Sequence, residues 1–262
     1  MRVERASLWT ECVFHVLAHV EARGLAASCF NRVWVERAAL ELGLAATRPL
    51  GEDTRVIAAA AGTHDVLASV QALAWVFDSA DAARSVADRE LAALESDDVA
   101  SLGALSIARS AGPIAEVLRA ATELELPLLE RLEPVSDEQL AGLAEAMAAV
   151  VPAAPSLPRF ETVAARPLGL RGRTFGVSIA IGVPGIGCPD AEHAAWQAAH
   201  EATVNELAAL RDAGFLELER RAIALLRSRA RAAGLAEAHA RWLARLDLSA
   251  LGPIADVDDA AR

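Results

Sequence analysis

A run of ten residues, 174–183, most limits what this chain can fold into. Apolar side chains alternate in it with small or polar ones. The apolar residues are Phe175, Val177, Ile179, Ile181 and Val183. This period of two is typical of a β-strand with one buried face. The small residues on the other face indicate that another part of the chain packs closely over it. We expect a partner strand within 161–170, joined through a turn at 171–173.

The rest of the chain has the apolar spacing of amphipathic helices. Helices are predicted over residues 4–22, 28–42, 64–77, 136–150, 190–212, 215–233 and 236–247. The sequence Ser136-Asp137-Glu138-Gln139 is a capping box that opens one of them, and Asp190 is placed to cap another. The predicted fold class is mainly α: a multi-helix bundle with one inserted β-hairpin at about residues 161–183.

A proline-rich segment gives the best internal boundary. Pro152, Pro155 and Pro158 fall close together, and prolines at this density are typical of a linker or a long crossing loop. We therefore expect a helical domain over 1–150. A β-hairpin with C-terminal helices over 151–262 should pack with it as one compact unit.

Composition excludes several classes of partner. Of 262 residues, 54% are hydrophobic, which is enough for a sizeable core, and the net charge of −11 argues against a nucleic-acid binder. No apolar run is long enough to suggest a membrane span. The three cysteines are widely spaced without a CxxC pair, which favours a reducing, cytoplasmic location. All 25 basic residues are arginine, a bias typical of a bacterial genome rich in GC.

Two histidines near the N-terminus form the first candidate site. His15 and His19 are four residues apart in a predicted helix, so their rings lie on one face and could chelate a metal ion. Two ligands leave a metal site incomplete. The competing interpretation is that both histidines are structural and hydrogen-bonded to neighbours.

A second candidate is the pair His200-Glu201, which follows the predicted strand. Zinc peptidases place two histidines and a glutamate in an HExxH helix, but position 204 here is Val204 and the second ligand is missing. His193 lies two helical turns before His200, about 10.5 Å along the axis, too far for the two to share one ion unaided.

Joining the two stretches gives the sharpest functional hypothesis. His15, His19 and His200 would bind a zinc ion, or alternatively iron, and leave a position open for water. Glu201 would be the general base, with Glu11 as an alternative base or fourth ligand. The chain would then be a metal-dependent hydrolase acting on a small molecule or peptide, cleaving an amide or peptide bond. Carboxylate-rich ExxH motifs of di-iron bundles are lacking, which disfavours a redox role.

Other interpretations stay open. The chain could be a non-enzymatic helical interaction or scaffold protein with structural histidines. Cys188, at a strand-to-helix junction, could form a nucleophile–base pair with His193, although a buried inert thiol is the commoner meaning. His64-Asp65 is explained by a helix start, and His239 is expected at the surface among arginines. The oligomeric state is not predicted.

Overall fold

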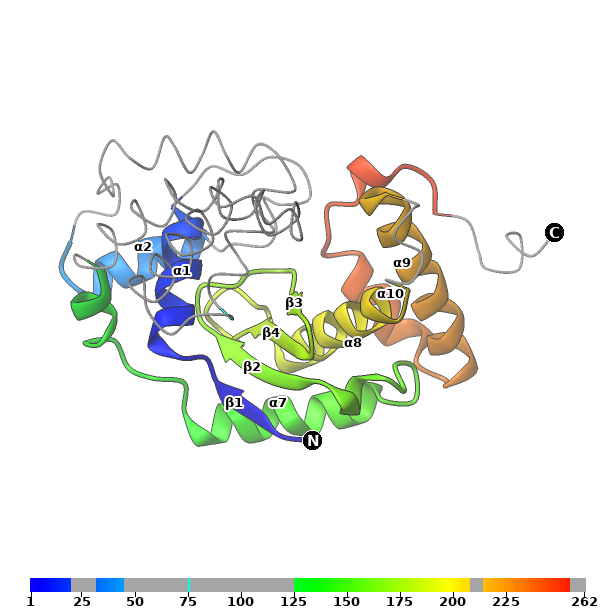
Figure 1. Cartoon of the computed structure of the whole chain (residues 1–262), viewed down its shortest axis with the longest axis horizontal. Helices are drawn as coiled ribbons and strands as arrows, with labels where there is room; N and C mark the ends of the chain where they lie inside the picture. The colour runs from blue at the N-terminus through cyan, green and yellow to red at the C-terminus, as the bar shows by residue number, and fades with distance from the viewer. Residues whose placement is uncertain (20–31, 45–74, 76–124, 208–213, 255–262) are drawn as a thin grey trace, which may run out of the picture. The chain divides into compact units, whose positions relative to one another are not determined.

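The computed structural model describes most of the chain outside two long stretches (Figure 1). The described residues are 1–19, 32–44, 75, 125–207 and 214–254. The predicted helix over 64–77, with the His64-Asp65 pair, lies outside them except for residue 75, and the predicted start of the helix over 28–42 also lies outside them.

The chain divides into two compact units. A sheet unit contains Met1–Ala6 and Pro134–Arg262, and a helical unit contains Ser7–Arg23 and Arg32–Glu133. After the helical unit, the chain therefore returns to the sheet unit between residues 133 and 134. The boundary predicted at 151–160, between two parts packed as one compact unit, stays a prediction.

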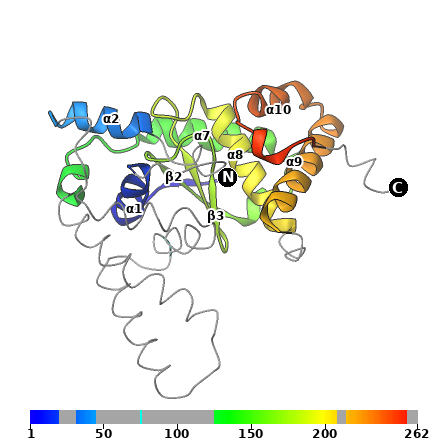
Figure 2. The same cartoon turned by 90° about the horizontal axis from the view of Figure 1, so that it is seen from above.

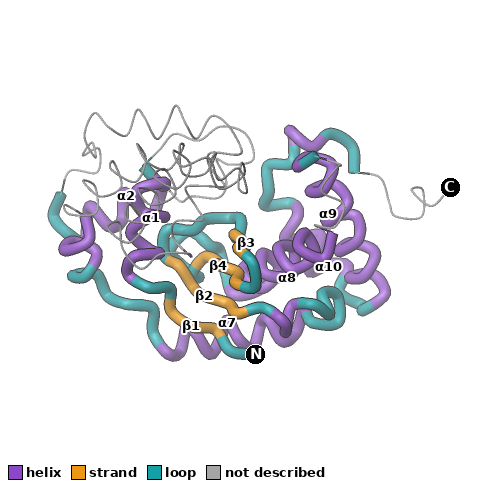
Figure 3. The backbone as a smooth tube through the Cα atoms, in the orientation of Figure 1, coloured by secondary structure: helices purple, strands orange, loops and turns teal. Residues whose placement is uncertain are grey.

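The sheet unit is built on a four-stranded mixed sheet (Figure 3). Its strands are β1 (Val3–Arg5), β2 (Glu161–Ala165), β3 (Arg173–Phe175) and β4 (Ser178–Gly182), in the order β1-β2-β4-β3. β1 pairs with β2 in parallel, and β2 with β4 in parallel, while β3 is antiparallel to β4.

The prediction of a helical bundle with one hairpin is therefore wrong, because a mixed sheet with packed helices is an α/β fold. Residues 161–165 do form a strand, but it is the parallel neighbour of β4 and not its hairpin partner. The segment predicted as the start of the first helix contains β1, which pairs with residues 162–164. A three-residue strand carries too little alternation to be distinguished from the amphipathic helix after it.

The hairpin lies inside the run that was predicted as one strand. Gly176 has φ of 58°, a left-handed conformation that glycine adopts without steric cost. It turns the chain, so that Arg173 pairs with Ala180 and Phe175 with Ser178. The expected turn at 171–173 is wrong, because Arg173 already belongs to β3.

Four α-helices and two short 3-10 helices complete the described sheet unit. They are α7 (Asp137–Val150), η3 (Leu157–Arg159), α8 (Ala191–Leu207), α9 (Phe215–Ala232), α10 (Ala236–Leu243) and η5 (Ser249–Leu251). The predicted capping box is confirmed, since Ser136 and Gln139 exchange side-chain-to-backbone hydrogen bonds. Asp190 also caps as predicted, because its Oδ1 accepts from the His193 amide at 2.7 Å.

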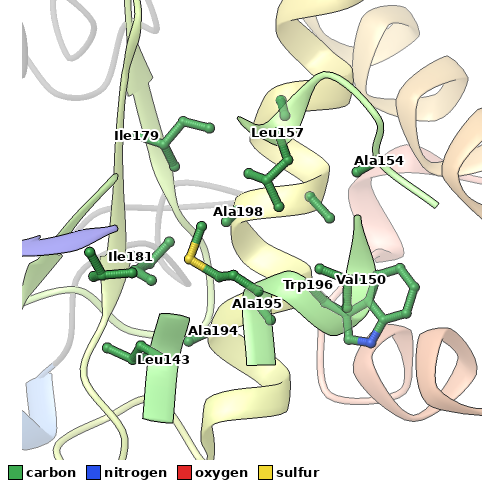
Figure 4. Packing of buried hydrophobic residues seen from close by; sticks show 14 of the residues in the cluster. Leu143, Val150, Ala154, Leu157, Ile179, Ile181, Ala194, Ala195, Trp196 and Ala198 are labelled. Atoms are coloured by element: carbon green, nitrogen blue, oxygen red, sulfur yellow. The ribbon is translucent and has the colours of Figure 1, made fainter. Parts of the chain in front are cut away.

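The core of the sheet unit lies between α7, α8 and β4 (Figure 4). Leu143 of α7 and Ile179 and Ile181 of β4 belong to one buried cluster, to which α8 contributes a row of alanines, among them Ala194 and Ala198. Small side chains let α8 approach both neighbours closely. Full burial of an isoleucine such as Ile179 contributes about 2 kcal/mol.

Gly182, at the end of β4, is a place where the fold tolerates no side chain. A Cβ there would lie 2.9 Å from the carbonyl oxygens of Leu168 and Gly169. We expect Gly182→Ala to lower the free energy of unfolding by about 1–3 kcal/mol through this clash. Gly142→Ala on α7 is the matched control, because nothing lies within 4 Å of its Cβ and alanine favours helix. Urea denaturation of both variants should give shifts of opposite sign, and equal shifts would contradict the packing.

The helical unit contains α1 (Leu8–Ala18) and α2 (Arg32–Glu41), which contact each other (Figure 2). Ser7 caps α1 by accepting from the Thr10 amide at 3.0 Å. Residues 9–18 of α1 are all buried. No helix in the described part of the chain has the length and apolar character needed to cross a membrane.

Candidate functional site

The residues of the predicted metal site fall in different units. His15 and His19 belong to the helical unit, and His200 and Glu201 to the sheet unit. Within the described residues, no three side chains of His, Cys, Asp or Glu are grouped as a metal ion requires. The three-histidine site stays a prediction.

His15 and His19 lie together, as their spacing predicts. Their ring centroids are 4.6 Å apart. His15 Nε2 lies 3.2 Å from Glu125 Oε2, and its Nδ1 accepts from the Trp34 indole at 3.0 Å. Both ring nitrogens of His15 are thus engaged, and metal binding would have to displace one partner. His19 Nδ1 donates to the His15 carbonyl at 2.9 Å.

In the sheet unit, His200 of α8 and Arg171 of the loop after β2 both contact one carboxylate oxygen of Glu219 on α9. His200 Nε2 lies 3.2 Å from Glu219 Oε2, and Arg171 Nη1 donates to the same oxygen at 2.8 Å. The three side chains are only 5–6% exposed. Glu219 therefore fixes His200 of α8 and Arg171 of the loop after β2 to α9.

The charge of Glu219 is set by these two partners. Burial alone would raise the pKa of its carboxyl, but His200 and Arg171 outweigh burial and lower the pKa to about 2. Glu219 is thus an anion at neutral pH. With Nε2 of His200 directed at this anion, Nδ1 is buried and has no hydrogen-bond partner among the described residues.

Glu201, the next residue on α8, points to the β3 side of the site. Its Oε2 accepts from Thr174 Oγ1 at 2.6 Å, and its side chain is buried. Gly172 makes room for it, because a Cβ there would lie 2.9 Å from Glu201 Cγ. Burial lowers the pKa of Arg173, while the carboxylates of Glu201 and Glu219 raise it. Arg173 therefore lies within electrostatic reach of both acids.

Two further residues of α8 hold the loop that carries Arg171. His193 Nε2 donates to the Leu170 carbonyl at 3.0 Å. Gln197 Nε2 donates to the Gly169 carbonyl at 2.6 Å, and its Oε1 accepts from the Gly182 amide at 3.0 Å. Gln197 thus ties the loop to the end of β4, which positions the residues that follow.

His239 is buried, so its expected place at the surface is wrong. It lies on α10 three residues before Trp242, on the same face. Its ring centroid is 5.1 Å from that of Trp196, in an edge-to-face contact, and 5.5 Å from that of Trp242, in a tilted one. Burial is the main cause that lowers the pKa of His239 to about 4, and the positive charge of Arg227 lowers it further. Its neighbouring arginines suggested exposure, whereas the helical spacing to Trp242 was the signal for burial.

Cys188 is not placed as a nucleophile. Its Sγ donates to the Asp190 carbonyl at 3.3 Å, and burial is the main cause that raises the pKa of the thiol to about 12. His193 is engaged with Leu170 instead. Cys188 is thus a protonated, buried thiol at neutral pH.

The sequence did not point to Arg171, Thr174 or Glu219. Arg171 lies in a segment predicted as a turn, and Glu219 in a helix whose mixed charges suggested a solvated face. The residues around Arg171 and Glu219 form no pattern that predicts a buried side chain at either position. Comparison of the chain with protein-family models, curated proteins and solved structures gives no match.

Proposed function

We propose that this chain is a hydrolase in which Thr174 is the nucleophile and Glu201 the general base. The observation that carries the proposal is the 2.6 Å hydrogen bond from Thr174 Oγ1 to Glu201 Oε2. A nucleophile hydroxyl within hydrogen-bond reach of a base, which is itself held in place, is the arrangement that covalent catalysis requires.

The reaction would proceed in two balanced steps on an ester or amide. Glu201 takes the proton of Thr174 Oγ1 as this oxygen attacks the carbonyl carbon. The proton then passes to the leaving alcohol or amine, which leaves an acyl-threonine. Water attacks this ester, Glu201 takes a water proton and returns it to Oγ1, and the acid is released. Arg173 supplies positive charge near the developing oxyanion.

Arg171, His200 and Glu219 support the site as positioning residues. They join the loop, α8 and α9 through one carboxylate oxygen. Because His200 precedes Glu201 in α8, this junction restricts the orientation of the general base. Fixed orientation is what makes a catalytic group effective.

Thr174→Val and Thr174→Ser test the nucleophile directly. Valine keeps the shape of the side chain and removes its hydroxyl, while serine keeps the hydroxyl. With p-nitrophenyl acetate as probe, Thr174→Val and Glu201→Gln should each lower the hydrolysis rate by about 100-fold or more, because nucleophile and base are lost. Thr174→Ser should retain most of it. Intact-protein mass spectrometry should find one acetyl group on wild type and none on Thr174→Val; equal rates and masses would refute the proposal.

The zinc hydrolase predicted from the sequence is the second candidate, and one observation favours it. Metal-binding histidines commonly donate one ring N–H to a carboxylate, and His200 does so to Glu219 while Nδ1 has no partner among the described residues. In this version Glu201 would act on metal-bound water.

Metal content decides between the two candidates. If zinc or iron is required, elemental analysis of the purified protein should find about one ion per chain. His200→Ala should lose the ion, and Glu201→Gln should keep it while losing activity. Wild-type protein without stoichiometric metal would exclude the metal-dependent version. Absence of both metal and hydrolysis would favour the non-enzymatic interaction protein.

A further inference from the structure

We infer that Arg171 binds a carboxylate group of the substrate. Its guanidinium is buried and uses one nitrogen, Nη1, to donate to Glu219. The other two nitrogens, Nε and Nη2, are also buried and have no hydrogen-bond partner in the described part of the chain. Buried donors of a charged group are rarely left without an acceptor.

The two remaining nitrogens define the shape of the acceptor. Nε–H and one Nη2–H of a guanidinium are parallel and form a fork that matches the two oxygens of a carboxylate. Glu219 accepts from the third nitrogen, Nη1, which does not belong to this fork. Arg171 is thus held by one carboxylate and presents its bidentate edge to another.

The surrounding charges favour a carboxylate over a phosphate. Glu219 and Glu201 already place two anions next to Arg171 and Arg173. Asp247, an exposed carboxylate, also lies within electrostatic reach of Arg171. A ligand with one negative charge is repelled less by these acids than a dianion would be.

The position of Arg171 relates the bound group to the proposed chemistry. It precedes Thr174 by three residues, in the loop that His193 and Gln197 hold. The substrate class would be esters or amides that also carry a free carboxylate, such as N-acyl amino acids. This assignment to a substrate rests on the proposed function, whereas carboxylate binding by Arg171 does not.

N-acetylglycine and N-acetylglycinamide are a matched pair of probes, because they differ only in the carboxylate. Isothermal titration of wild-type protein should show saturable binding of N-acetylglycine, with the amide and inorganic phosphate binding at least about tenfold more weakly. Arg171→Lys, which keeps the charge and loses the fork, should weaken N-acetylglycine binding by about tenfold or more. Thr174→Val should bind it as wild type does, so loss of catalysis and loss of carboxylate binding are separable.

A measurement on wild-type protein keeps the test independent of variant folding. N-acetylglycine should shift the ¹⁵N resonance of one arginine Nε–H, and the amide should not. Equal binding of acid and amide, tighter binding of phosphate, unchanged binding by folded Arg171→Lys, or no shifted Nε–H resonance would each overturn the inference.

Discussion

Glu219→Gln is expected to lower the free energy of unfolding by about 3–5 kcal/mol. The substitution keeps the shape of the side chain and removes its charge, which leaves the Arg171 guanidinium buried without its counter-ion. His200 loses the same partner. Urea denaturation at pH 7 measures the change.

Glu217→Gln, two residues earlier on α9, is the matched control. Glu217 pairs with Arg220 and Arg221, but these side chains are 33–49% exposed, and solvent screens such pairs. Its urea midpoint should stay close to that of wild type. If both variants lost similar free energy of unfolding, the buried Arg171–Glu219 pair would contribute no more to stability than an exposed pair does.

Stability is expected to fall in two windows as the pH is lowered. The pKa of His239 is about 4 in the folded protein against 6.5 ordinarily, so protonation favours the unfolded chain and stability is lost between pH 6.5 and 4. The pKa of Glu219 is about 2 against 4.5, so its contribution is present above pH 4.5 and is lost towards pH 2. Each shift corresponds to roughly 3 kcal/mol.

Urea midpoints measured from pH 8 to pH 3 test this dependence. His239→Phe keeps an aromatic ring and removes the titrating group, so the decline between pH 6.5 and 4 should shrink. It should not vanish, because burial also lowers the pKa of His193. A variant with the pH profile of wild type would show that His239 does not titrate as its surroundings require.

Local signals predicted the helices of the sheet unit well. The capping box at Ser136 and the cap at Asp190 depend on side chains within a few residues of the helix start, and both are observed. The sheet depends on distant pairing. β1 has three residues and pairs with Glu161–Ala165, so no local pattern could separate a hairpin from parallel strands.

The sequence pattern singled out only two residues of the candidate site, because its other residues lie far away in the chain. His200 and Glu201 were singled out because they share a helix with the histidine His193 after a strand, and both are buried in a polar network. Their partners Thr174 and Glu219 come from other elements. Burial of a glutamate among arginines is decided by tertiary packing, which residue spacing alone does not encode.

The pairing of β1 has a consequence for synthesis of the chain. Val3 pairs with Thr162, so the first strand leaves the ribosome long before its neighbour exists. Domains generally fold as units during translation, and α1 and α2 of the helical unit, which both precede β2 in the chain, can form before β1 has its partner strand. Closure of the sheet is therefore a late event, and premature termination before β2 would release a strand edge without its native partner.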